Sequence, residues 1–165
     1  MDQTYLYRDM YAKARSGLLI MLFLTVANLT TVVLSQSETV FVFSSALAEL
    51  AFGLMMGAYM SADQPMYWVI LGGLALAAIL VTYFLCWLFC KKKSRWLVIG
   101  TLLFIVDSVA RVVLLVIAFA NVDDPGRDID LLPTVIGFVF SAWVLYYLIR
   151  GVWAARKLAA AKSEE

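Results

Sequence analysis

The chain has 165 residues, of which 64% are hydrophobic and 15% are charged, and its formal net charge is +1. The apolar residues fall into long blocks instead of amphipathic stripes, which excludes a soluble globular domain. The sequence contains no histidine, so it lacks the commonest general base and the usual ligand of haem and catalytic zinc. We therefore expect an all-α integral membrane protein that is not an enzyme and that needs no metal, cofactor or nucleic acid.

Residues 1–15 are expected to form a cytoplasmic segment at the membrane interface. Apolar side chains recur at helical spacing between Tyr7 and Ala14, which predicts a short helix in the headgroup region that leads into the first span. A frayed polar tail is the alternative interpretation. The basic residues come late and no small-residue cleavage site follows the next apolar run, so a cleaved signal peptide is not expected.

The first predicted span covers residues 16–35. Thr25, Asn28, Thr31 and Ser35 lie on one face of this helix and give it a polar stripe. Such a stripe commonly forms hydrogen bonds to a neighbouring helix, and this is the favoured interpretation. The functional alternative is one wall of a polar cavity within the membrane.

The next apolar segment, 39–60, is long enough to span but carries Glu49 at its centre. It also contains Gly53 and Gly57 in the small-xxx-small pattern of closely packed membrane helices. A polar break with a proline follows, and residues 67–90 then predict a full span. Two cysteines near the end of that span are interpreted as buried small residues and not as a metal site.

The helix predicted over residues 96–121 places Asp107 and Arg111 in its middle, where each charge costs about 2.5–3.5 kcal/mol on insertion scales. Because the two are four residues apart, they share one helical face and can form an intrahelical ion pair. We therefore expect this face to turn toward other helices or a wet cavity and away from lipid.

The last predicted span covers residues 131–149 and carries Ser141 on a face of small and polar residues. A basic helical tail follows it. The expected organisation is thus an interfacial segment at 1–15, a transmembrane bundle at 16–150 and a basic cytoplasmic tail at 151–165.

Charge fixes the expected topology. Three of the thirteen Lys and Arg residues precede the first span, four lie at 91–95 and four follow from Arg150 onward, so eleven share one side if both termini do. The positive-inside rule puts that side in the cytoplasm. Parity then requires that 39–60 does not cross, which predicts four spanning helices plus a re-entrant or outer-leaflet helical segment. The alternative has five spans and an outside N-terminus.

Three stretches carry a resemblance to a known family: YFLCWLFCKKKSRWLVIGTLLFIVDS, FVFSSALAEL and WVLYYLIRGVWAARKL. The chain resembles, from about residue 14 to about residue 158, an uncharacterised family of small polytopic membrane proteins from Gram-positive, often gut-dwelling, bacteria. The resemblance implies a bundle of about four spans in a bacterial plasma membrane and carries no activity. Members resemble this chain at Asp107, whereas Arg111 departs from the family's apolar residues, so the ion pair is not expected to be a shared device.

The function expected from the sequence is that of a non-catalytic helix-packing subunit or partner-binding component. Its partners would be the lipid bilayer and either a second copy of the chain or another membrane protein. The alternative is a small transporter or channel for a proton, an ion or a small polar solute. The candidate site is the set of polar residues predicted inside the membrane: Asp107, Arg111, Asn28, Thr31, Glu49 and Ser141.

Overall fold

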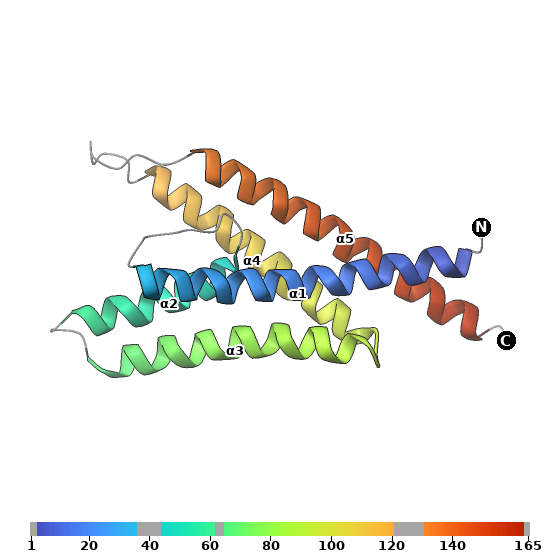
Figure 1. Ribbon diagram of the computed structural model, residues 1–165, viewed down its shortest axis with the longest axis horizontal. Coiled ribbons are helices and arrows are strands. Elements are labelled where there is room, and N and C mark those ends of the chain that lie inside the picture. The colour runs from blue at the N-terminus through green and yellow to red at the C-terminus, as the bar shows by residue number, and fades with distance from the viewer. Residues whose placement is uncertain (1–2, 36–43, 62–64, 121–130, 164–165) are drawn as a thin grey trace.

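The structure is a computed structural model that describes residues 3–35, 44–61, 65–120 and 131–163. These residues form a bundle of α-helices (Figure 1). The helices run in chain order as α1 Gln3–Ser35, α2 Ala46–Met60, α3 Tyr67–Cys90, α4 Arg95–Ala120 and α5 Leu131–Ser163.

Four of these helices, α1, α3, α4 and α5, are long and apolar enough to cross a membrane. The fifth, α2, has 15 residues and is about 22 Å long, which is shorter than the ~30 Å hydrocarbon core. The predicted all-α fold, with four helices of spanning length plus one shorter apolar helix, is confirmed. That α2 does not cross the membrane stays a prediction. Residues 39–43, which the prediction included in the short segment, lie outside the described residues.

Helix α2 begins inside the bundle. Figure 1 shows its first turn beside α1 and α4, partway along their lengths, and its last turn near the start of α3. Ser45 is the N-cap of α2: its backbone is extended and its hydroxyl oxygen accepts from the Ala48 amide at 3.2 Å. A serine N-cap explains why the helix begins at Ala46, because it satisfies one of the amides that no helical carbonyl can reach.

Helices α1 and α5 have 33 residues each and are about 50 Å long, so both exceed the ~30 Å hydrocarbon core. Both helices run unbroken past residues 15 and 150, and their overhanging ends pack on each other. Ala14 fits against Gly151, where an added Cβ would clash with it, and the ring of Tyr7 meets that of Trp153 edge-on at 5.3 Å.

The apolar core fills the half of the bundle nearer the chain ends. Its largest fully buried side chains include Leu18 and Met21 of α1, Tyr83 of α3, Phe104 of α4 and Leu148 of α5. The two cysteines of α3, Cys86 and Cys90, are buried in the same cluster, which confirms their interpretation as buried small residues.

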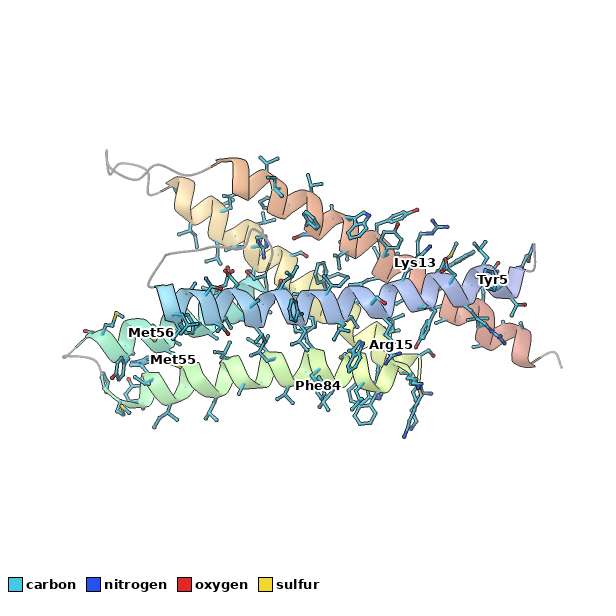
Figure 2. The ribbon with its side chains drawn as sticks, in the orientation of Figure 1. Tyr5, Lys13, Arg15, Met55, Met56 and Phe84 are labelled. Atoms are coloured by element: carbon cyan, nitrogen blue, oxygen red, sulfur yellow. The ribbon has the colours of Figure 1, made fainter. Side chains whose placement is uncertain are left out.

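The basic residues gather at one end of the molecule. The first turn of α1, the last turn of α5 and the junction between α3 and α4 lie toward the same end in Figure 1. Arg15 joins α1 to α3 at this end. Its Nε donates to the Trp87 carbonyl at 3.1 Å, and its guanidinium lies 5.0 Å from the centre of the Trp87 ring. It thereby places a positive charge at the C-terminal end of α3, where the helix dipole is negative. Figure 2 shows Arg15 on the side of α1 that faces α3.

Candidate functional site

Polar side chains from α1 and α4 converge on the first turn of α2. Thr25 and Asn28 of α1 are buried, as are Asp107 of α4 and the two serines that begin the α2 segment, Ser44 and Ser45. These residues lie just beyond the apolar core, since Thr25 follows Met21, and Asp107 follows Phe104, by about one helical turn. We name this group, together with Glu49 and Arg111, the polar cluster.

Asp107 binds the N-terminus of α2. The side chain is 2% exposed, and its Oδ1 accepts from the Ser45 hydroxyl at 2.6 Å and from the Leu47 amide at 3.0 Å. Leu47 lies in the first turn of α2, where backbone amides have no helical partner and the helix dipole is positive. A carboxylate at this position both satisfies the amide and complements the dipole, so Asp107 anchors the start of α2 to α4.

Glu49 and Asn28 join α2 to α1. The Asn28 side-chain amide donates to Glu49 Oε1 at 2.9 Å and to the Ser44 hydroxyl at 3.3 Å, and the Ser44 hydroxyl also donates to Glu49. Thr25 adds a third contact, because its Oγ1 accepts from the Ser45 amide at 2.9 Å. Two members of the predicted polar stripe, Thr25 and Asn28, therefore form hydrogen bonds to a neighbouring helical segment, as the favoured interpretation predicts.

Arg111 binds the same segment from α4 by donating from its guanidinium to the Ser44 carbonyl. Its Nε is buried and lacks a hydrogen-bond partner among the described residues. The predicted ion pair between Asp107 and Arg111 is wrong. Among the described residues, the ion pair observed joins Lys13 and Asp9. The two α4 side chains instead hold one segment, 44–47, at different points.

Two predicted site residues bond within their own helices. The Thr31 hydroxyl donates to the Ala27 carbonyl at 2.8 Å, and the Ser141 hydroxyl donates to the Gly137 carbonyl at 2.9 Å. Both are bonds to the residue four positions earlier, the usual choice for a hydroxyl inside a helix. The hydrogen bonds described here do not join either residue to the polar cluster, whereas they bring Asn28, Glu49, Asp107 and Arg111 together.

The buried polar groups of Ser44, Ser45 and Tyr83 were not predicted from the sequence. A serine directly before an apolar helical run is an N-cap signature, so Ser45 could have been found and the start of α2 with it. Tyr83 of α3 has no comparable signal. It is 1% exposed, and its hydroxyl has no hydrogen-bond partner in the described part of the chain.

The cluster holds two carboxylates and one guanidinium, each engaged with the α2 segment. Among the described residues, no group of three or more His, Cys, Asp or Glu is placed to hold a metal ion. The geometry is that of an anchor: it fixes where α2 begins and how deep it lies in the bundle.

The face of α2 that carries Gly53 and Gly57 points away from the bundle. A Cβ added at either glycine would meet nothing within 4 Å. The two glycines line a shallow groove of about 300 Å³ that runs on to Ser61 and to Trp68 of α3. Helix α3 approaches α2 elsewhere, through Gly72. The close-packing pattern recognised in the sequence therefore has no partner helix within the described bundle.

Comparison with family models, curated proteins and solved structures gives no match to this chain.

Proposed function

We propose that the protein is a non-catalytic membrane protein of a bacterial plasma membrane. In this proposal it binds a second copy of itself through the open Gly53–Gly57 face of α2. The observation that carries the proposal is this face, which is built of small residues and faces open space. Small residues let two membrane helices approach closely, which favours association where no hydrophobic driving force operates.

The polar cluster supports the same function. Its charged groups fix α2 to α1 and α4: Asp107 accepts from the Leu47 amide, and Glu49 accepts from the Asn28 side-chain amide. A short helix held rigidly at its buried end presents its outer face in one orientation. Pre-organisation of this kind lowers the entropy cost of association.

The oligomeric state of Gly57→Leu tests the proposed interface. The wild type is expected to be a dimer in mild detergent, and the leucine to raise the dimer's dissociation constant at least roughly tenfold, because it fills the groove. Light scattering over a concentration series measures this. Ala77→Leu, on an exposed part of α3, is the matched control and should leave the dimer intact. A wild type that stays monomeric at all concentrations would contradict the proposal.

The proposed topology places both chain ends and the α3–α4 junction in the cytoplasm, in keeping with the eleven cations that the sequence assigns to that side. In a background without Cys86 and Cys90, single cysteines at Leu34 and Ser61 are expected to react with an impermeant maleimide in intact cells. A cysteine at Lys92 is expected to react only after permeabilisation. Labelling of Leu34 and Ser61 from opposite sides would show that α2 crosses the membrane.

A second candidate function is a small transporter of a proton, an ion or a small polar solute. It is favoured by the Tyr83 hydroxyl and the Arg111 Nε, two buried polar atoms without hydrogen-bond partners in the described part of the chain. Proton or cation uptake into proteoliposomes that is lost in Glu49→Gln, with the dimer unchanged, would select this function over the first.

A further inference from the structure

A second groove lies between α1 and α5, away from both the polar cluster and the Gly53–Gly57 face. Its volume is about 380 Å³, within the range of small-molecule sites. Helices α1 and α5 cross where Ala14 meets Gly151 and diverge from there, as Figure 1 shows. The groove occupies the diverging side of this crossing.

The wall of the groove is apolar over most of its length. Gly17 and Ile20 of α1 form one side, and Phe140, Trp143 and Val144 of α5 form the other. Gly17 leaves the groove open at this point, because a side chain there would occupy the space between α1 and α5. An added Cβ would lie 3.7 Å from Val144. Such a wall suits a hydrocarbon chain lying along the helices.

The end of the groove nearest the helix crossing is polar. Lys13 and Ser16 of α1 and Tyr147 of α5 line it. Figure 2 shows Lys13 on the α5 side of α1, whereas Arg15 turns toward α3. The groove therefore has a cation and hydroxyl groups at one end and aromatic and aliphatic side chains at the other.

The depth of Lys13 matches that of lipid headgroups. Arg15, two residues on, donates to the carbonyl of Trp87 in the last turn of α3, and Trp96 lies in the first turn of α4 at the same end of the bundle. Tryptophan and tyrosine gather at membrane interfaces, so this aromatic level marks the boundary between hydrocarbon and headgroups. A lipid with one acyl chain in the groove would thus have its headgroup beside Lys13.

From this arrangement we infer that the α1–α5 groove binds an anionic phospholipid, with one acyl chain along the apolar wall and the phosphate at Lys13. The Lys13 ammonium pairs with Asp9 at 2.7 Å, but both side chains are about half exposed. An exposed pair of this kind is weak, so a lipid phosphate can replace the carboxylate. The clustering of cations at this end of the molecule adds to the attraction for anionic headgroups.

Quenching by lipids with brominated acyl chains tests the site, because Trp143 lies in the groove wall. The detergent-solubilised protein is titrated with brominated phosphatidylglycerol, phosphatidylcholine or fatty acid. The fluorescence lost on Trp143→Phe isolates the signal of that residue. Half-quenching of Trp143 is expected at a roughly fivefold lower concentration of phosphatidylglycerol than of phosphatidylcholine, as expected for about one cation acting on the headgroup.

Two variants separate the headgroup from the chain. Lys13→Gln is expected to remove the preference for phosphatidylglycerol, while Lys92→Gln, exposed in the α3–α4 junction, should keep it. Gly17→Leu is expected to block quenching by both phospholipids. Gly17→Ala, which needs no neighbouring atom to move, is the milder variant if the leucine prevents folding and should weaken quenching in the same direction.

Equal quenching by the two phospholipids would overturn the inference, as would equal loss of preference in Lys13→Gln and Lys92→Gln. Quenching by the fatty acid as strong as that by phosphatidylglycerol would show that a phosphate is not selected. Trp143 shielded from every brominated lipid would show that protein covers the groove, which also overturns it.

Discussion

Replacing Asp107 by leucine is expected to destabilise the protein by about 3–5 kcal/mol. The carboxylate accepts two hydrogen bonds, from the Ser45 hydroxyl and the Leu47 amide, and bonds to a charged acceptor are worth about 1.5–3 kcal/mol each. Leucine leaves both donors without an acceptor inside the membrane, where water is not available to replace the carboxylate. Equilibrium unfolding in mixed micelles measures the change.

The same measurement can locate the partner of Asp107. A double-mutant cycle with Ser45→Ala is expected to give a coupling energy of about 1–3 kcal/mol, larger than that of a cycle with Arg111→Met. Asp9→Asn is the control, since it removes an exposed carboxylate whose ion pair is worth roughly 0–1 kcal/mol. A larger coupling to Arg111 than to Ser45 would restore the ion pair that the spacing in the sequence predicts.

Replacing Gly72 by alanine is expected to separate α2 from α3 and to cost about 1–3 kcal/mol or more. A Cβ at this position would lie 2.8 Å from the Met55 amide nitrogen and 2.9 Å from the Ala51 carbonyl oxygen. These atoms are backbone, so no side-chain rotation can make room and the helix itself must move. Unfolding in mixed micelles measures the loss of stability.

The neighbouring glycine provides a matched control for this change. A Cβ at Gly73 would lie 3.6 Å from the Met55 sulfur, which is ordinary contact with a flexible side chain. Gly73→Ala should therefore be close to neutral, because it removes a helical glycine at little steric cost. Equal effects of the two alanines would mean that the approach of α2 to α3 is looser than the structure has it.

The fold was predictable because spanning helices depend on local sequence. Long apolar blocks exclude other structures in a membrane. The grouping of Lys and Arg, with the parity of the crossings, predicted that one of the five apolar segments does not cross. The contact of Ala14 with Gly151 was not predicted, since it joins parts of the chain that no local pattern relates.

The candidate site was predictable in composition but not in connectivity. Asp107, Arg111, Asn28 and Glu49 are unusual residues for a membrane interior, and the structure gathers them around one helix end. The predicted partner of Asp107 was wrong because a cation four residues away is visible in the sequence, whereas the observed partner, Ser45, lies 62 residues earlier. Ser141 was selected for its polarity, yet a hydroxyl within a helix can satisfy itself on its own backbone.

The anchoring of α2 by Asp107 has a consequence for how the protein is made. Ser45 leaves the ribosome 62 residues ahead of its acceptor, a delay of about 3–12 s at ordinary rates of synthesis. During that interval α1 can supply Thr25 and Asn28, but the first amide of α2 that Asp107 will bind has no carboxylate to meet. We therefore expect the short helix to reach its final depth only after α4 has entered the bilayer and its Asp107 can accept from Ser45 and Leu47.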